Sequence, residues 1–386
     1  MASPTVSLLK RLSSVLKYFL KIDEIQTSFY IKSSYKDRGV RLASRRFKLI
    51  VLDFGMDSNS NIKEQLDQIA KYLVDLRKSI DEQQTYLALV AQIINWRQEI
   101  NSPQEGLRQR PLIQGILGGQ GTGKTTLCRL LCKLLKIAGY SAVSLSLDDL
   151  YKTYLDRQQL QIHEPKLRWR GPPGTHDIQL GIDTLEQIRL GNSQQQIALP
   201  RFDKSLWAGM GDRTTPELVN QPDIVFFEGW FVGVLPIPEE SFQDNYQDDR
   251  QPLLPLINPL NSLVNSPIIT EVVGVASTVE NRAFALYSNQ QLQNYLPLWQ
   301  LVDKLIMLYP KDYQYSLQWR LQAEQEMIQS GKPGMDLEQI RDFVQYFWQA
   351  LPPQLFLTPL TKQPTPVDLI IPLDQNHNFE KICYPV

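Results

Sequence analysis

The chain has 386 residues and a formal net charge of −1, and 42% of its residues are hydrophobic and 21% are charged. This composition is typical of a globular protein long enough for two or three domains, and the near-neutral charge gives it no overall affinity for polyanions. The chain has three cysteines (Cys128, Cys132 and Cys383), and the pair Cys128 and Cys132 lies far from the histidines in the sequence, so no zinc-type cluster is expected and a reducing compartment fits.

The first hundred residues have helical periodicity. Apolar residues recur at helical spacing in 4–21 and again in 60–100, where Leu73, Leu76 and Ile80 continue the pattern. Between these segments, "FKLIVLDFG" is a short strand or a buried turn. We therefore expect a mostly helical extension over residues 1–104, ahead of a second domain over residues 105–386.

Residues 1–50 carry an excess of Lys and Arg, which we interpret as the solvated face of a helix. Residues 1–22 contain Ser, Lys and Arg and no acidic residue, as transit peptides do. The chain has no run of about 18 apolar residues, so we expect no transmembrane span. The expected location is cytoplasmic, with a transit peptide as the alternative.

From residue 112 strand-like and helical segments alternate. The strand-like runs are "LIQGIL", "SAVSLSL", "DIVFFEGWF" and "DKLIMLYP", and helical segments cover 124–137 and 177–190. This alternation predicts an α/β fold with a mainly parallel sheet flanked by helices. Residues 243–267 are rich in Pro, Asn, Gln and Asp, which indicates a surface loop or an insertion.

A glycine-rich loop follows the first of these strand-like runs. Residues Gly118 to Thr125 read G-x-x-x-x-G-K-T, the phosphate-binding loop, and the motif stands between a predicted strand and a predicted helix. Its backbone N–H groups would surround the phosphates of ATP, Lys124 would reach the β- and γ-phosphates, and Thr125 would bind Mg²⁺. The expected nucleotide-binding residues are Gly118, Gly119, Gln120, Gly121, Thr122, Gly123, Lys124, Thr125 and Thr126.

Two carboxylates follow the next predicted strand. Asp148 and Asp149 in "SLSLDDLYK" stand at the carboxyl end of the strand, where α/β sheets place their ligands. A carboxylate there can accept a proton from an attacking hydroxyl group or help to hold Mg²⁺. Because successive side chains of a strand face opposite sides, only one of the two can face the phosphates. We expect Asp148 to do so and Asp149 to cap the segment that follows.

A third acidic position ends the buried run "PDIVFFEGWFVG". Glu228 stands where P-loop enzymes usually place a second anchor for Mg²⁺ and its waters. The segment has no D-x-x-G, and no N-K-x-D follows later, so the sequence does not fit a signalling GTPase.

With these three elements, the sequence resembles the P-loop kinases of the uridine kinase, pantothenate kinase and phosphoribulokinase group. Within that group it is most similar to the plant and cyanobacterial D-glycerate 3-kinase family. The segments that carry the narrower resemblance are "SLDDLYKTYLDRQQL", "RWRGPPGTHDIQLG", "LPRFDKSLWAGMGDR", "DIVFFEGWFVG", "NQQLQNYLPLWQLVD" and "GMDLEQIRDFVQYFWQALPP". Together they extend over about residues 105–385.

The resemblance implies an ATP- and Mg²⁺-dependent kinase that converts D-glycerate to 3-phospho-D-glycerate, in glycerate metabolism and photorespiratory salvage. By the same resemblance Asp148 is the general base and Glu228 organises the magnesium, so the implied metal residues are Thr125, Asp148 and Glu228. His176 and Asp177 match the substrate-lid segment and Asp203 matches a substrate-side position. Arg320 occupies the place of a lid arginine, for which Arg341 is a competing candidate.

A glycerate site needs a cation for the carboxylate of the acceptor, and arginine binds carboxylates through two parallel hydrogen bonds. Arg168, Arg170, Arg201 and Arg213 are available, and we assign Arg170 and Arg201 to the substrate. The expected partner is therefore a small molecule, with no nucleic acid. Two alternatives remain open: a kinase for another hydroxylated metabolite such as pantothenate or a nucleoside, and a non-catalytic, regulatory ATP-binding protein. Tyr151, Trp169 and Trp207 could stack on a nucleoside.

Overall fold

The computed structural model of the chain describes residues 60–101, 109–191, 196–244, 279–329, 331 and 334–386. The chain divides into two compact units, the first with Met1–Gln92 and Lys133–Tyr140 and the second with Ile93–Cys132 and Ser141–Val386. The helix and the strand or turn expected within residues 4–59 lie outside the described residues, and so does most of the stretch 243–267.

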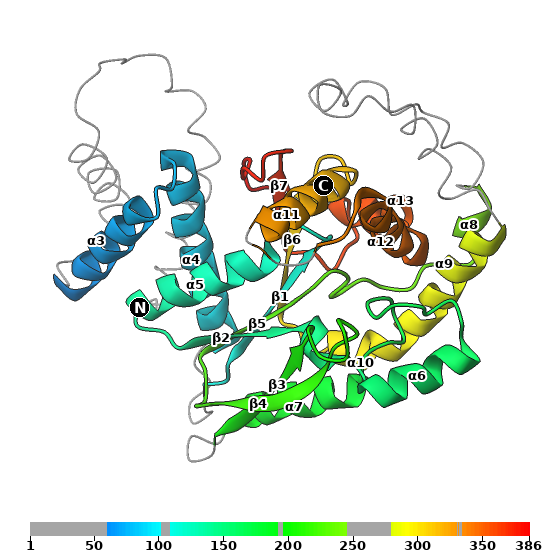
Figure 1. Cartoon of the computed structure of the whole chain (residues 1–386). Helices are drawn as coiled ribbons and strands as arrows, with labels where there is room; N and C mark the ends of the chain where they lie inside the picture. Colours follow the sequence, from blue (N-terminus) through cyan, green and yellow to red (C-terminus); the bar gives the residue numbers. More distant parts are fainter. Residues whose placement is uncertain (1–59, 102–108, 192–195, 245–278, 330, 332–333) are drawn as a thin grey trace. The chain divides into compact units, whose positions relative to one another are not determined.

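The elements of the chain are labelled in Figure 1. The helices are α3 (Ser60–Asp75), α4 (Ile80–Ile100), α5 (Lys124–Ile137), α6 (Tyr154–His163), α7 (Ile178–Leu190), α8 (Ser241–Asp244), α9 (Val279–Leu292), α10 (Leu296–Trp299), α11 (Tyr315–Gln329), α12 (Leu337–Ala350) and α13 (Pro353–Phe356). The strands are β1 (Leu112–Gly118), β2 (Ala142–Ser146), β3 (Ile197–Asp203), β4 (Asp212–Val219), β5 (Ile224–Gly229), β6 (Lys304–Pro310) and β7 (Leu369–Leu373). Three 3₁₀ turns cover Leu147–Leu150, Gln293–Tyr295 and Thr358–Thr361.

The helical segment expected over residues 60–100 is interrupted. Helix α3 ends at Asp75 and α4 begins at Ile80, and Arg77 between them has a φ of 56°. Ser79 and Glu82 form reciprocal side chain–backbone hydrogen bonds of 3.2 and 2.9 Å, which is the capping box that starts a new helix. Leu76 falls in the break and is 44% exposed, so the periodicity that included it as a core position was wrong there.

A five-stranded sheet with the order β2-β5-β1-β6-β7 forms the centre of the second unit, and its strands pair in parallel. Every residue of β1 and of β5 is buried. Helices cover both faces of a parallel sheet, and for that reason these strands have continuous apolar sequences rather than alternating ones. The mainly parallel sheet predicted from the alternation of segments is confirmed.

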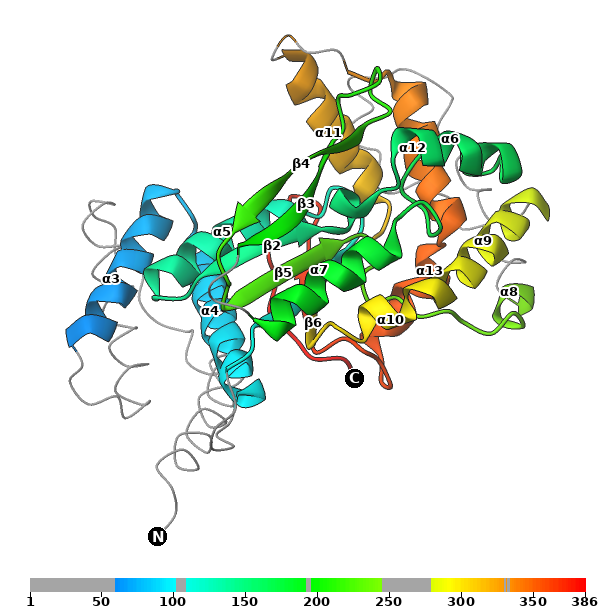
Figure 2. The same ribbon diagram turned by 90° about the horizontal axis from the view of Figure 1, so that it is seen from below.

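One face of this sheet packs on α7 and α10, which lie beside it in Figures 1 and 2. Leu185 and Ile188 of α7 and Leu298 of α10 belong to the same apolar core as Val225 and Phe227 of β5. Helix α7 starts at its N-cap Asp177 and ends at Gly191, whose φ of 56° closes the helix in the left-handed conformation. The helix expected over residues 177–190 is therefore confirmed to within one residue.

The hairpin of β3 and β4 was not anticipated from the sequence. The two strands pair antiparallel, with Phe202 opposite Arg213, and form a separate two-stranded sheet. Their burial does not alternate regularly, so the period of two that identifies most strands is missing. The turn between them, residues 204–211, contains Trp207 and Ala208 at φ values of 52° and 53°.

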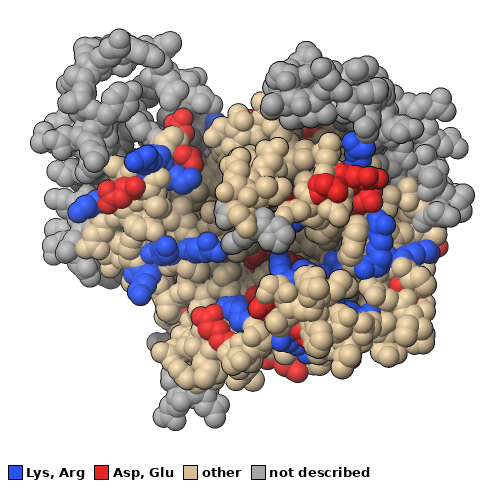
Figure 3. All heavy atoms as spheres, viewed as in Figure 1, with Lys and Arg blue, Asp and Glu red and all other residues tan. Residues whose placement is uncertain are grey.

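On the face of the molecule shown in Figure 3, basic and acidic side chains are interspersed and neither sign covers a large area. This distribution agrees with the net charge of −1. Within the described part of the chain, no helix combines the length and the apolar character needed to cross a membrane.

Candidate active site

The glycine-rich loop joins the carboxyl end of β1 to the first residue of α5. Gly121 and Gly123 have φ values of 75° and 83°, which side chains other than glycine rarely adopt. The Thr122 hydroxyl and the Lys124 ammonium each donate a hydrogen bond of 2.8 Å to the Gly119 carbonyl. These bonds fix the curvature of the loop and hold the lysine over it, where it can reach bound phosphates.

The remaining loop residues differ in their surroundings. The side chains of Thr125 and Thr126 are exposed in the first turn of α5. Gly118 lies so close to Thr122 that a Cβ atom there would be 2.7 Å from its hydroxyl oxygen. Gln120 is at the tip of the loop, and its buried side-chain oxygen has no hydrogen-bond partner among the described residues.

Thr125 and Glu228 are brought together by the pairing of β1 with β5. The Thr125 hydroxyl donates a 2.7 Å hydrogen bond to the Glu228 carboxylate, which is 4% exposed at the end of β5. Magnesium in phosphate-transfer enzymes binds to one or two protein oxygens and to phosphate oxygens of the substrate. These two groups fit that pattern, whereas the described residues contain no group of three or more His, Cys, Asp or Glu that could hold a metal alone.

The Asp148 carboxylate lies in the 3₁₀ turn after β2 and has two partners. It accepts a 2.7 Å hydrogen bond from the Tyr151 hydroxyl at Oδ1 and a 2.6 Å ion-paired bond from Lys204 at Oδ2. Burial raises the pKa of Asp148, but the positive charge of Lys204 and these two hydrogen bonds outweigh it and lower the pKa to about 2. Asp148 is therefore ionised and able to accept a proton.

Asp149 faces a different set of groups. Its carboxylate accepts hydrogen bonds from the backbone N–H groups of Ser146 (3.0 Å) and Phe202 (3.2 Å), and it forms a 2.9 Å ion pair with Arg201. The bond to Ser146 is part of a capping box, so Asp149 caps this turn as expected. The reasoning from strand alternation was wrong, however, because β2 ends at Ser146 and both carboxylates lie on the 3₁₀ turn.

The four candidate arginines have distinct partners. Arg201 is bound by Asp149 and Glu217, and Arg213 forms a 2.7 Å ion pair with Asp177. Arg170 instead donates to the carbonyl groups of Gly209 (2.8 Å) and Met210 (3.0 Å) and lies 6.0 Å from the centre of the Tyr151 ring.

Among the described residues, Arg170 has no carboxylate partner. Arg168 is exposed and stacks on Trp169, at 4.3 Å from its ring centre. Arg170 is thus a half-buried cation beside the Tyr151 ring that has no carboxylate partner among the described residues, whereas Arg201 and Arg213 are engaged in ion pairs.

His176 is buried between aromatic rings. It stacks on Tyr151 with ring centres 4.6 Å apart, and its Nδ1 lies 2.8 Å from the Tyr295 hydroxyl. The Tyr295 oxygen already accepts a 2.9 Å hydrogen bond from Gly174 N–H, which leaves its hydroxyl hydrogen to donate to His176. Burial lowers the pKa of His176 to about 3, so the ring is neutral. His176 therefore supports the ring of Tyr151, whose hydroxyl group binds Asp148.

Asp177 and Asp203, the other residues assigned to the substrate, take part in local structure. Asp177 caps α7 and pairs with Arg213. Asp203 accepts hydrogen bonds from the N–H group and the hydroxyl of Ser205, at 2.8 and 2.6 Å, and so orders the start of the β3–β4 turn.

Arg320 lies on α11, one residue after Trp319, which contacts the phosphate loop at Gly121. Its guanidinium group forms an ion pair with Glu324 and lies 4.9 Å from the centre of the Phe343 ring. Both partners of the guanidinium group, Glu324 on α11 and Phe343 on α12, belong to these helices and not to the phosphate loop. The role of Arg320 as a lid arginine remains a prediction.

Lys204 and His377 near the site were missed from the sequence, and Tyr151 was named there only as a ring that could stack on a nucleoside. Tyr151 and Lys204 contact Asp148, and both lie within the segments that carry the family resemblance. His377 lies 2.7 Å from the Gly121 carbonyl through Nε2 and stacks on Trp319 with ring centres 4.2 Å apart. No sequence signal indicates the His377 contact, because 256 positions separate the two residues.

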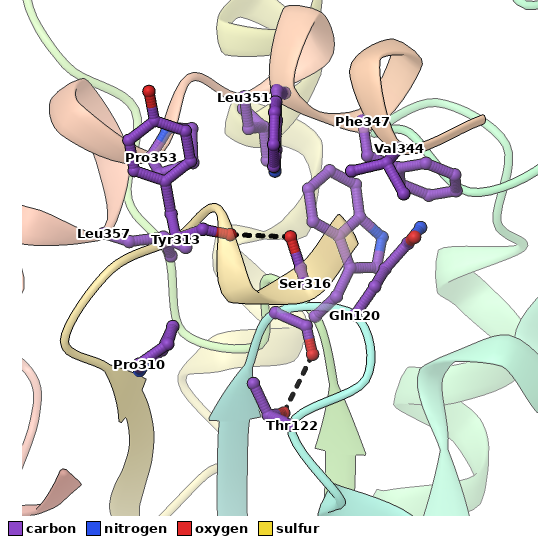
Figure 4. Close-up of a pocket in the computed structure, with 13 residues that line it drawn as sticks. Gln120, Thr122, Pro310, Tyr313, Ser316, Val344, Phe347, Leu351, Pro353 and Leu357 are labelled. Atoms are coloured by element: carbon purple, nitrogen blue, oxygen red, sulfur yellow. Dashed lines mark hydrogen bonds between the residues drawn. The ribbon is translucent and has the colours of Figure 1, made fainter. Parts of the chain in front are cut away.

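A cavity of about 40 Å³ lies beside the tip of the phosphate loop (Figure 4). Gln120 and Thr122 of the loop line it together with residues from the end of β6 and from α11, α12 and α13. Most of the lining is apolar, including Tyr313, Val344 and Phe347, and such surroundings disfavour a charged acceptor. The polar groups around Asp148 are therefore the better candidate for the acceptor site.

The curated relatives of the chain are kinases. It is 30% identical over 281 residues to the chloroplastic D-glycerate 3-kinase of Arabidopsis thaliana, a match that covers 69% of this chain and 54% of the relative. The chain thus spans about half the length of that protein. It is also 30% identical to an uncharacterised kinase of Schizosaccharomyces pombe, with 62% of this chain and 79% of the relative covered. A scan against protein-family models finds no match.

A solved structure gives the same result. The D-glycerate 3-kinase of Cryptococcus neoformans superposes with a TM-score of 0.64 at 27% sequence identity, over 78% of this chain and 99% of that chain. On the basis of these relatives and of its phosphate loop, the chain belongs to the ATP-dependent small-molecule kinases of the P-loop group, in which it is similar to D-glycerate 3-kinases.

Proposed function

We propose that the protein transfers the γ-phosphoryl group of ATP to the 3-hydroxyl group of D-glycerate. The observation that carries the proposal is Arg170, a half-buried cation that has no carboxylate partner in the described part of the chain and lies beside the ring of Tyr151, whose hydroxyl is bound to Asp148. An acidic acceptor needs such a cation next to the base. Two of the relatives, from Arabidopsis thaliana and Cryptococcus neoformans, are named D-glycerate 3-kinase, which agrees with a small hydroxy acid as the acceptor.

In this reaction Asp148 accepts the proton of the 3-hydroxyl group as its oxygen attacks the γ-phosphorus. The new O–P bond forms while the bond to the bridging oxygen breaks, which gives ADP and 3-phospho-D-glycerate. Lys124 lies over the phosphate loop and balances the charge that develops on the phosphate oxygens. Arg170 holds the carboxylate, so that positioning and electrostatics provide most of the catalysis.

Thr125 and Glu228 would hold the Mg²⁺ ion that accompanies ATP, and Asp148, whose negative charge acts on Lys124 together with that of Glu228, would take part. When bound, the ion supplies positive charge to the phosphate oxygens. The direct bond between Thr125 and Glu228 keeps both oxygens on the side of the loop from which α5 starts.

A nucleoside acceptor is less well supported, because the candidate stacking rings are already engaged. Tyr151 stacks on His176, and Trp207 stacks on Tyr154 with ring centres 4.8 Å apart. Trp169 is covered by Arg168 and by the edge of Tyr346. A regulatory, non-catalytic role is disfavoured by the complete set of Lys124, Thr125, Asp148 and Glu228.

The test is an acceptor screen with the full chain, ATP and Mg²⁺. D-glycerate, L-glycerate, pantothenate, uridine and glycerol are compared by ADP release, and the product is identified by ³¹P and ¹³C NMR. We expect D-glycerate to give the highest kcat/KM and a product phosphorylated at C3. A preference for pantothenate or uridine would contradict the acceptor, and no ADP release with any acceptor would contradict catalysis.

A further inference from the structure

The β3–β4 turn, residues 204–211, brings one cation to the candidate base. The Lys204 ammonium lies 2.6 Å from Asp148 Oδ2, while the side chain of Lys204 is 60% exposed and that of Asp148 is 31% exposed. Among the described residues, Asp148 is the acidic partner of Lys204. No part of the proposed reaction uses this lysine.

The turn is held in place by other groups. Arg157, which is 5% exposed, donates 2.6 Å hydrogen bonds to the carbonyl groups of Met210 and Gly211. Arg170 binds the carbonyl groups of Gly209 and Met210 from the neighbouring segment. An ion pair with an exposed lysine contributes little to stability. The backbone of the turn therefore does not depend on the bond between Lys204 and Asp148.

Both oxygens of Asp148 are occupied before any acceptor binds. Tyr151 holds Oδ1 and Lys204 holds Oδ2, yet the base must accept a hydrogen bond from the hydroxyl group of the acceptor. Tyr151 is 3% exposed and is fixed by its stacking on His176. Lys204 is exposed on a flexible four-carbon stem, so it is the partner that moves at the lower cost.

The charge of the acceptor determines what that movement costs. A carboxylate placed near Asp148 brings a second negative charge, and it offers Lys204 a new partner as the ammonium leaves Oδ2. A neutral acceptor offers no such partner, so its hydroxyl group must compete with an intact ion pair. The ion pair between Lys204 and Asp148 thus favours anionic acceptors and disfavours neutral ones.

We propose that Lys204 is a specificity-determining residue, which leaves Asp148 when an acidic acceptor binds and then pairs with the carboxylate of that acceptor. The inference deepens the proposed function and rests on it for the class of acceptor. Lys204 and Arg170 then bind the same carboxylate, and the departure of Lys204 frees Oδ2 for the attacking hydroxyl group.

The test compares Lys204→Met and Lys204→Arg with the wild-type protein. The matched control is Lys78→Met, which removes a lysine from an ion pair with Glu82 in the first unit. For each protein, kcat and KM are measured with D-glycerate and with its neutral amide, D-glyceramide. A charge-assisted hydrogen bond corresponds to about 10–100-fold in affinity. We expect Lys204→Met to raise the KM for D-glycerate by that factor and to leave or lower the KM for the amide.

The ratio of kcat/KM for the acid to that for the amide should therefore fall by about 10-fold or more in Lys204→Met. In Lys204→Arg the acid-to-amide ratio of kcat/KM should stay close to the wild-type value, and in Lys78→Met it should be unchanged. An equal loss with both acceptors, or an unchanged ratio, would overturn the role of Lys204, since a structural or phosphate-directed lysine would act on both acceptors alike.

The same measurements separate this inference from the proposed function. If the acceptor screen finds a different acid, such as pantothenate, the acid and its amide replace the glycerate pair. Loss of discrimination in Lys204→Met then supports Lys204 while the glycerate assignment fails. If the best acceptor is neutral, both the proposed function and the role of Lys204 are overturned.

Discussion

Asp148 and Asp149 are adjacent in the sequence, yet their carboxylates belong to separate hydrogen-bond networks. Asp148 is bound by Tyr151 and Lys204, and Asp149 is bound by Arg201 and two backbone N–H groups. Successive side chains of a 3₁₀ turn point about 120° apart, so neighbours on such a turn face different surroundings. Asp148 therefore remains the candidate base, whereas Asp149 stabilises the 3₁₀ turn.

This separation predicts different effects of two matched substitutions. Asp148→Asn removes the proton acceptor and should lower kcat by about 10²–10⁴-fold with ATP binding retained. Asp149→Asn should lower the free energy of unfolding by about 1–3 kcal/mol through its lost ion pair and reduce kcat by no more than about tenfold. Steady-state kinetics, ATP affinity and urea unfolding of both variants check this. If kcat falls strongly in Asp149→Asn and stays near the wild-type value in Asp148→Asn, the two roles are reversed.

Lys124→Ala should abolish turnover without unfolding the protein. Within the described part of the chain the ammonium group makes one hydrogen bond, to the Gly119 carbonyl, so its loss removes little from the folded state. We expect the Tm of the ATP-free protein to change by no more than about 2 °C. Lys133→Ala, at an exposed position of the same helix, is the control and should keep full activity. Substantial kinase activity in Lys124→Ala would rule out its role at the phosphates.

His176 should make the protein less stable in acid. Burial lowers the pKa of His176 to about 3, below its ordinary value of 6.5, so the unfolded chain binds a proton that the folded chain does not. Stability therefore falls as the pH drops below about 6.5, by about 2.5 kcal/mol between pH 7 and pH 4.5. Urea unfolding at the two pH values measures this loss. In His176→Asn the pH-dependent part should shrink by that amount, and an identical pH dependence in both proteins would contradict a neutral buried ring.

His377 should support the phosphate loop from outside. Its bond to the Gly121 carbonyl and its stacking on Trp319 are lost in His377→Ala. A loop that is held less firmly binds phosphates more weakly, so we expect the KM for ATP to rise about 3–10-fold with kcat nearly unchanged, as for the loss of one hydrogen bond. His163→Ala, at an exposed position at the end of α6, is the control. Equal ATP affinities of the two variants would show that the contact does not act on the loop.

The sequence by itself determined the parts of the protein that depend on short-range patterns. Gly118 to Thr125 identified the phosphate loop, because its glycines and its lysine serve one local geometry. The buried run that ends at Glu228 and the helix over 177–190 followed from apolar runs, periodicity and capping residues. The α/β fold followed in turn from the order of these segments, since short connections between alternating strands and helices give a parallel sheet.

Only the tertiary structure decided which charged groups meet. The sequence could not separate Arg170 from Arg201 as substrate ligands, but the β3–β4 hairpin places Arg201 against Asp149 and Arg213 against Asp177, and Arg170 has no carboxylate partner among the described residues. The same hairpin brings Lys204 to Asp148, 56 positions away. Ion pairs of this kind depend on which elements lie side by side, and no local pattern encodes that distance. Sequence periodicity reports the face on which a residue lies, whereas its partner is set by the packing of the whole chain.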